Sequence, residues 1–435
     1  MTDLSYDFGI CPACNKKREA FAWCVNCDVR QLEKNFNLWT SGDPGIDDFI
    51  KYTQRNSTRG MDYLEWIDYN QFSHINNTGK AGAFASNYSA IWVKGPKCLA
   101  DNGRSWIRCG PIQVILKQFL PVFEKSEKSL SQLYKYHKCF IEGSLADFYG
   151  FSRDERTSRF FIVMKEFNCG DLYSVMDTQG EVLCWRDVVE ILSQISEGLF
   201  KIHQMGLTHG NLHGGNILIE QDEIMMHARI ADTGLCGDLI MEKVFGVIPF
   251  VAPEIFNGYE KTQASDIYSF GMLMMMLLSG LRPFHDRSHD SQLIEDIKRG
   301  LKPYYSNKTP QVYLQLMTRC WDNNPNARPS AMELHKTISG WLYALCYDIQ
   351  VNELSEQFDT AEEIKYLFLD SPTTVRTIHH NAIYKSSHIY GFNWWEYMRL
   401  KRNRTLYGLY RNNNSEGQIL PLLTYNGAKT EDYRN

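Results

Sequence analysis

The fold of this chain is indicated first by a stretch of eight residues, His209-Gly210-Asn211-Leu212-His213-Gly214-Gly215-Asn216. They follow a segment whose apolar residues recur at helical spacing, so we expect a loop at the end of a helix. The apolar residues of that segment are Val188, Ile191, Leu192, Ile195, Leu199 and Ile202. In the loop, the side-chain amide oxygen of Asn211 can accept a hydrogen bond and orient a hydroxyl group. That oxygen is too weakly basic to take the proton of the hydroxyl.

Five further motifs accompany the loop in a fixed order along the chain. They are Val114-Ile115-Leu116-Lys117, Asp232-Thr233-Gly234, Ala252-Pro253-Glu254, Asp266-Ile267-Tyr268-Ser269-Phe270-Gly271 and Arg328-Pro329. Together with the loop they resemble the ordered pattern of the protein kinases. The resemblance implies an α+β, bilobal protein-kinase fold over residues 71–341, with a small antiparallel-sheet lobe and a large helical lobe.

The same resemblance implies a site for ATP and Mg²⁺. Lys117, on an expected third strand, would anchor the phosphates of ATP, and Gly82 belongs to the loop that would cover them. Met164 stands at the gatekeeper position of an expected strand over 160–164. Asn216 and Asp232 keep the two positions that hold Mg²⁺ in the family.

Four residues depart from the kinase pattern. Asn211 replaces the aspartate that accepts the proton of the substrate hydroxyl, and Gly210 replaces the preceding arginine. Gln132 stands where a glutamate pairs with the ATP-anchoring lysine, and Ala85 replaces a glycine of the phosphate loop. The segment from 232 to 254 has Thr233 as its one hydroxyl-bearing residue, so we expect no activating phosphorylation site there.

Two classes of function stay open. The first is a pseudokinase that binds ATP weakly and acts as a signalling scaffold or regulator. The second is an ATP-dependent Ser/Thr-type protein kinase of reduced activity. Loss of a positioned base costs about 10²–10⁴ in rate, and the four departures together favour the pseudokinase.

Structural positions of the family are kept. Glu254 and Arg328 are expected to form a buried ion pair in the large lobe, and Asp266 is expected to brace the backbone of the loop. Around residues 11–27, 266–271 and 328, the chain resembles the expanded tyrosine-kinase-like, Ser/Thr-type kinase family of arbuscular mycorrhizal fungi, with a degenerate catalytic loop. In that family a cysteine ribbon often precedes the kinase.

Four cysteines, Cys11, Cys14, Cys24 and Cys27, form two C-x-x-C pairs near the N-terminus. Two such pairs can complete a tetrahedron of thiolates around Zn²⁺, so we predict a structural zinc ribbon over residues 8–30. Metal binding would supply the folding energy of so short a segment. The alternatives for these cysteines are a set of unpaired or buried thiols, and a redox C-x-x-C pair. A zinc-ribbon nucleic-acid binder is a third function for the chain.

Composition bounds the partners and the compartment. The chain has 435 residues and a net charge of −5, which argues against a general nucleic-acid or membrane-surface binder and leaves protein partners or a protein substrate. Residues 1–10 do not read as a secretory signal, and the longest apolar run, 271–278, is too short to span a bilayer. Twelve cysteines then suggest a reducing compartment with free thiols or metal ligands, and a cytoplasmic location, with the nucleus open.

The remaining segments are expected to be accessory. Residues 31–70 read as a helical linker, and an extended hairpin carrying Lys97 and Arg108 is expected between the second and third strands. Residues 342–435 are expected to form a C-terminal helix, with apolar positions at Leu354, Phe358 and Ala361, followed by a partly disordered tail.

Overall fold

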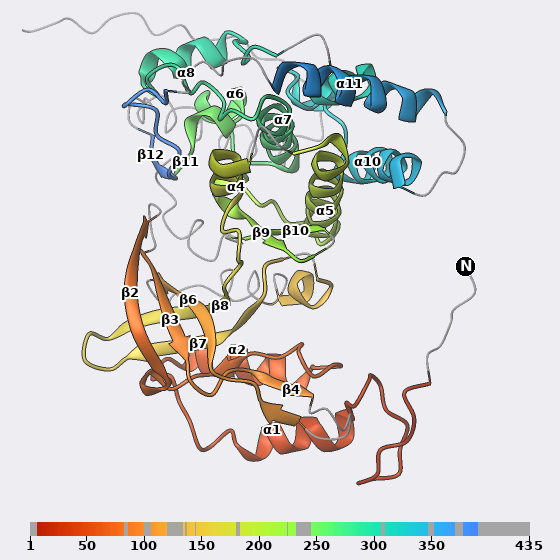
Figure 1. Cartoon of the computed structure of the whole chain (residues 1–435). Coiled ribbons are helices and arrows are strands. Elements are labelled where there is room, and N and C mark those ends of the chain that lie inside the picture. Colours follow the sequence, from red (N-terminus) through yellow and green to blue (C-terminus); the bar gives the residue numbers. More distant parts are fainter. Residues whose placement is uncertain are drawn as a thin grey trace, which may run out of the picture. The chain divides into compact units, whose positions relative to one another are not determined.

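The computed structural model describes residues 7–81, 86–99, 106–119, 134, 137–143, 145–179, 183–223, 225–231, 245–305, 309–346, 352–369 and 377–389 (Figure 1). Several residues singled out in the sequence lie outside these ranges: Gly82, Ala85, Gln132, Asp232, Thr233 and the tail beyond residue 389.

The first half of the described chain builds a six-stranded sheet in the order β1-β7-β8-β6-β3-β2. The strands are β1 (Glu65–Trp66), β2 (Phe72–Ala81), β3 (Ser86–Trp92), β6 (Ile112–Phe119), β7 (Phe148–Asp154) and β8 (Arg159–Lys165). Neighbouring strands are antiparallel except for β1, which pairs parallel with β7. The predicted antiparallel small lobe, with strands at 113–119 and 160–164, is therefore confirmed.

The segment 31–70 contributes both helices and a strand to this lobe. Helix α1 (Arg30–Lys34) is followed by α2 (Pro44–Arg55), and β1 lies near the end of the segment. Helix α2 begins at Pro44 because the carboxylate of Asp43 accepts hydrogen bonds from the N–H groups of Gly45 and Ile46. Its apolar stripe, with Phe49 and Ile50 fully buried, packs in one cluster with residues of β7 and β8 (Figure 1).

The predicted hairpin between the second and third strands is confirmed. Strands β4 (Lys97–Leu99) and β5 (Trp106–Arg108) pair antiparallel between β3 and β6. The structure also joins Cys98 and Cys109 in a disulfide across this hairpin, with Cα atoms 5.9 Å apart. The expectation of free thiols or metal ligands is wrong for this pair, because the antiparallel register brings the two cysteines within bridging distance.

The rest of the described chain forms a helical lobe. Its helices are α4 (Leu172–Gln179), α5 (Trp185–Gln204), α6 (Pro253–Phe256), α7 (Gln263–Ser279), α8 (Ser291–Lys298), α9 (Gln311–Cys320), α10 (Ala331–Cys346) and α11 (Glu353–Leu369). Two small antiparallel pairs complete it: β9 (Ile217–Gln221) with β10 (Met226–Ile230), and β11 (Phe245–Gly246) with β12 (Ser387–His388). One-turn helices are η1 (Val25–Val29), η2 (Tyr69–Gln71), η4 (Gly214–Asn216), η5 (Ile248–Phe250) and η6 (Pro325–Ala327).

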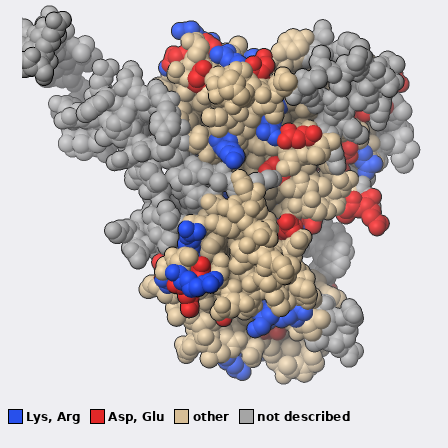
Figure 2. All heavy atoms as spheres, turned by 60° about the vertical axis from the view of Figure 1, so that its left-hand side comes forward, with Lys and Arg blue, Asp and Glu red and all other residues tan. Residues whose placement is uncertain are grey.

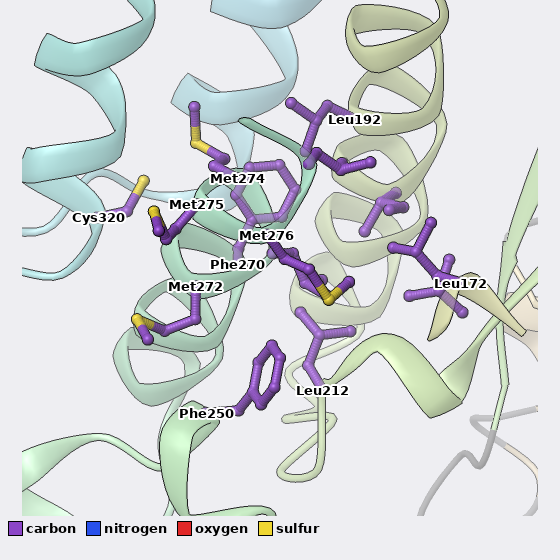
Figure 3. Packing of buried hydrophobic residues seen from close by; sticks show 14 of the residues in the cluster. Leu172, Leu192, Leu212, Phe250, Phe270, Met272, Met274, Met275, Met276 and Cys320 are labelled. Atoms are coloured by element: carbon purple, nitrogen blue, oxygen red, sulfur yellow. The ribbon is translucent and has the colours of Figure 1, made fainter. Parts of the chain in front are cut away.

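Helix α7 is the centre of the large-lobe core. It begins at a Thr262 cap, whose hydroxyl accepts from the N–H of Ser265, and ends at Gly280, which adopts the left-handed conformation. Every residue from 265 to 277 is buried. Four of them are methionines that belong to the same core cluster as Phe250, Phe270 and Leu212 (Figure 3): Met272, Met274, Met275 and Met276. Unbranched thioether side chains suit such a contact because they fill irregular gaps.

Two surface properties bear on the expected partners. Within the described ranges, no helix combines the length and the apolar character needed to cross a membrane. On the face shown in Figure 2, Lys and Arg side chains lie in small groups that alternate with Asp and Glu rather than in one broad basic patch.

Arg328 ties the end of the large lobe to α6. Its guanidinium makes two parallel hydrogen bonds to the carboxylate of Glu254, at 2.7 and 2.8 Å. It also donates to the carbonyl oxygens of Ala264 and Asp322. The Arg328 side chain is fully buried, so the predicted buried ion pair is confirmed.

We expect Arg328→Met to lower the free energy of unfolding by about 3–5 kcal/mol, because the carboxylate of Glu254 would stay inside without its partner. The control is Arg319→Met, since Arg319 makes an ion pair with Glu333 at 2.8 Å on the surface, where both side chains are about half exposed. That change should cost less than about 1 kcal/mol. Urea unfolding of the two variants measures the difference, and equal costs would contradict the assignment.

Candidate functional site

The loop 209–216 lies between α5 and β9 and is fixed from its core side. Leu212 is 1% exposed and packs against α7 (Figure 3). Gly214 makes a close approach that no side chain allows, because a Cβ atom there would stand 2.5 Å from the ring of Tyr173. These two contacts hold the middle of the loop against the helical core.

Asp266, in the first turn of α7, holds the beginning of the loop. One of its carboxylate oxygens accepts from the N–H of His209 and the other from the N–H of Gly210, both at 2.8 Å. The Nε2 atom of His203, in α5, lies 2.9 Å from the same carboxylate. Asp266 is 1% exposed, so these bonds form away from water. The prediction that Asp266 braces the loop backbone is confirmed.

His209 has a structural role in the same network. Its Nε2 atom donates to the carbonyl oxygen of Ala231 at 2.9 Å, and its Nδ1 atom accepts from the N–H of Asn211 at 3.2 Å. Both ring nitrogens are therefore used within the fold, which sets the orientation of Asn211.

Asn211 and Asn216 lie together, as the kinase resemblance implies. The side-chain amide of Asn216 donates to the backbone carbonyl of Asn211 at 2.8 Å. The carbonyl oxygen of Asn216 accepts at 2.8 Å from the N–H of Ala231, which directly precedes Asp232 in the sequence. With its amide nitrogen engaged, Asn216 would offer its side-chain oxygen to a cation, and an amide oxygen is a ligand that suits Mg²⁺.

Lys117 and Met164 lie on neighbouring strands of the small-lobe sheet. Lys117 is half-buried on β6, where it is registered with Asn87 on β3 and Ile162 on β8. Met164 on β8 packs against a small cluster that contains Phe167 and Ala231, so it approaches the residue before Asp232. Gly82 and Asp232 themselves lie outside the described residues.

Asn211 lines a groove, together with Val247, Phe250 and Val251, that the sequence did not disclose. The Oγ atom of Ser386 lies 3.5 Å from the Oδ1 atom of Asn211. Gly246 of β11 is also near, since a Cβ atom there would stand 3.9 Å from the same oxygen. The sequence Ile383-Tyr384-Lys385-Ser386 does not alternate apolar and polar residues, and Ile383 is 50% exposed, so no periodic signal could have indicated this segment.

The four N-terminal cysteines converge. Their sulfur atoms all lie within 4.8 Å of one another, with Cys11 and Cys27 at 3.9 Å and Cys14 and Cys24 at 3.6 Å. A tetrahedral zinc site with bonds of about 2.3 Å places its sulfurs about 3.8 Å apart, so the cluster has a suitable size. A backbone hydrogen bond from Ala13 lowers the pKa of the Cys11 thiol to about 7, whereas burial raises the pKa of Cys24 and the hydrogen bond with Cys14 raises the pKa of Cys27. Metal binding at this cluster would therefore have to displace protons from thiols.

The cysteine cluster is packed against the small lobe through aromatic rings. Trp23 stacks on Tyr63 with ring centroids 5.8 Å apart and meets Trp106 edge-on at 6.0 Å. The indole N–H of Trp106 donates to the carbonyl oxygen of Ala22 at 3.1 Å. The hairpin that carries Trp106 therefore packs directly against the segment that holds the cysteine cluster.

The family described as protein tyrosine and serine/threonine kinase matches residues 80–338. The chain is 31% identical over 191 residues to the probable serine/threonine-protein kinase roco8 of Dictyostelium discoideum, covering 41% of this chain and 10% of that protein. It is 31% identical over 163 residues to human receptor-interacting serine/threonine-protein kinase 1, covering 32% of this chain and 24% of that protein.

A third relative, another probable serine/threonine-protein kinase of Dictyostelium discoideum, is 24% identical over 277 residues, with 62% of this chain and 60% of that protein covered. The chain spans about a tenth of the length of the roco8 protein. The narrower likeness to the fungal tyrosine-kinase-like group stays a prediction.

We expect Asp266→Asn to destabilise the chain by about 1–3 kcal/mol, because the new amide nitrogen would point a donor at a backbone N–H. Asp222→Asn is the matched control: Asp222 also bonds a histidine, His227 at 3.0 Å, but its side chain is 54% exposed. That control should change the stability by less than about 1 kcal/mol. Denaturant unfolding of both variants provides the measurement, and comparable losses would show that the brace at Asp266 is not special.

Proposed function

The chain belongs to the protein tyrosine and serine/threonine kinase family, whose pattern covers residues 80–338, and from this premise we propose that it is a pseudokinase. It binds ATP weakly and acts as a regulator or scaffold for protein partners. Its loop keeps the position of a kinase loop, and its side chains no longer supply the transfer chemistry.

The observation that carries this proposal is the environment of Asn211. The loop backbone is braced by Asp266, and the hydroxyl group of Ser386 lies 3.5 Å from the Asn211 side chain. An aspartate there would accept a proton from such a hydroxyl, but an amide oxygen can only accept a hydrogen bond. The arrangement supports binding and orientation of a hydroxyl without its deprotonation.

The proposed nucleotide site uses residues from both lobes. Lys117 would bind the phosphates of ATP, Met164 would stand at the gatekeeper position, and Gly82 would lie over the phosphates. Asn216 and Asp232 would hold Mg²⁺, which neutralises phosphate charge when it is bound. The amide oxygen of Asn216 supports this assignment, since its amide nitrogen already bonds the Asn211 carbonyl.

A second candidate is a Ser/Thr-type protein kinase of reduced activity. The relatives are named serine/threonine-protein kinases, and the hydroxyl that faces Asn211 belongs to a serine. Phosphoryl transfer depends mostly on positioning and electrostatic stabilisation, so a chain without the base could retain slow transfer. The cytoplasmic location expected from composition fits either candidate and stays a prediction.

We also propose that Cys11, Cys14, Cys24 and Cys27 bind one structural Zn²⁺. Sulfur distances of 3.6 and 3.9 Å support this, as does the packing of Trp23 beside the cluster. Because Trp23 of the ribbon packs on Tyr63 and Trp106, the role of the zinc would be to stabilise the attachment of the N-terminal segment to the small lobe.

We expect the unaltered chain to transfer little phosphate from ATP-Mg²⁺ to a protein acceptor. Asn211→Asp should raise the rate at least about tenfold, since a positioned base is worth about 10²–10⁴. Radiolabel transfer measures the rate, and in the same samples a rise in unfolding temperature with ATP-Mg²⁺ reports binding.

The matched control is Asn257→Asp, which adds the same charge at an exposed position after α6 and should leave the rate unchanged. Lys117→Ala should remove both the gain and the thermal shift. Robust transfer by the unaltered chain, abolished by Lys117→Ala, would make the chain an active kinase and sink the pseudokinase proposal.

Protein purified without chelators should contain about one zinc per chain. Cys24→Ser should lose the metal, whereas Cys346→Ser, a change at a free cysteine outside the cluster, should keep it. Mass spectrometry of the metal content of the three proteins gives the result. An unaltered protein without zinc would refute the site.

A further inference from the structure

Residues 377–389 lie on the helical lobe near the loop 209–216, although they follow it by more than 160 positions. The N–H of His379 donates to the carbonyl oxygen of His285 at 2.8 Å, and the N–H of His289 donates to that of Asn381 at 3.1 Å. Further along, β12 pairs antiparallel with β11, with Ser387 opposite Gly246 (Figure 1). The segment is thus attached by backbone hydrogen bonds at both ends.

Tyr384 anchors the middle of the segment. It is 7% exposed, and its hydroxyl donates to the carbonyl oxygen of Pro283 at 2.7 Å. Its ring meets His289 edge-on at 4.8 Å and Tyr173 at 5.7 Å, while the guanidinium of Arg282 lies 5.3 Å from the ring centroid. A buried aromatic ring with a satisfied hydroxyl is typical of an anchor in a binding pocket.

Ser386 follows the anchor by two residues, beyond a bend at Lys385, and directly precedes β12. Tyr384 is buried, Lys385 is exposed and Ser386 is half-buried. The Ser386 hydroxyl is the group that meets the Asn211 amide at 3.5 Å. Residues 384–388 therefore place an aromatic anchor in the lobe, present a hydroxyl to the loop and add a strand to β11.

We propose that residues 382–389 are an internal peptide ligand of this groove, with Ser386 at the acceptor position. The groove would accept from a partner protein an extended segment of the same layout: an aromatic residue, one exposed residue, a serine and then a stretch that pairs with β11. Such a partner binds when the internal segment leaves. The inference rests on the proposed function only in treating Asn211 as the acceptor-facing position.

The pairing with β11 is strand addition, in which main-chain hydrogen bonds hold the segment and side-chain pockets select it. Gly246, opposite Ser387, stands where a Cβ atom would lie 2.8 Å from a methyl group of Val251, so glycine suits this paired position. The site therefore selects for the anchor and for the hydroxyl, while Lys385 faces solvent and can vary.

The test is binding of a fluorescent peptide with the sequence of residues 380–389 to the full chain, followed by anisotropy. The unaltered protein should bind it weakly, because its own segment fills the groove and lowers the fraction of molecules that can bind. Tyr384→Ala should release the internal segment and tighten the apparent Kd at least about tenfold. Tyr304→Ala, a change at a tyrosine that is 88% exposed, is the control and should behave as the unaltered chain.

A peptide whose tyrosine is replaced by alanine should fail to bind any of the proteins. Should Tyr384→Ala prove unfolded in a thermal scan, Ser387→Pro replaces it, since proline removes a strand N–H from the pairing with β11 and leaves the anchor pocket intact. Equal affinities of the released variant and the unaltered chain, or binding to neither, would overturn the proposal. Because the readout is binding, phosphate transfer by the unaltered chain would sink the pseudokinase proposal and leave this one standing.

Discussion

The carboxylate of Asp266 is the constraint on which the site depends. It accepts hydrogen bonds from two successive backbone N–H groups, those of His209 and Gly210, and meets His203 at the end of α5. These contacts use backbone atoms, so they hold the loop whatever side chain stands at position 211, whereas the φ of +73° at position 210 favours glycine. The shape of a kinase loop can therefore outlast its chemistry.

Residues that stabilise the fold are also separate from residues that would act on a substrate in the rest of the large lobe. The groups that hold it together, such as the Arg328–Glu254 pair and Leu212, face inward and are buried. The groups that would act on a substrate lie on the other side of the loop, toward the groove that Ser386 enters. Because the two sets share few atoms, substitutions in one leave the other largely undisturbed, so the proposed loss of transfer chemistry is compatible with an intact fold.

The sequence predicted what depends on periodicity or on ordered motifs. It predicted features that are local or belong to a shared family pattern: the strands β6 and β8, helix α5, the ion pair of Arg328 and the contact of Asp266 with the loop. It did not predict β1 or β12, since two-residue strands carry no periodic signal and gain their place from pairing with distant segments. The Cys98–Cys109 bridge was missed because composition alone argued for free thiols.

The methionines of α7 make the large lobe sensitive to oxidation when its core opens. Met272, Met274 and Met276 are fully buried in the core (Figure 3), so an oxidant reaches their sulfur atoms only in molecules that have opened. A sulfoxide is polar and does not fit back into an apolar contact. The rate at which these methionines are oxidised therefore depends on how often the lobe opens and how long it stays open.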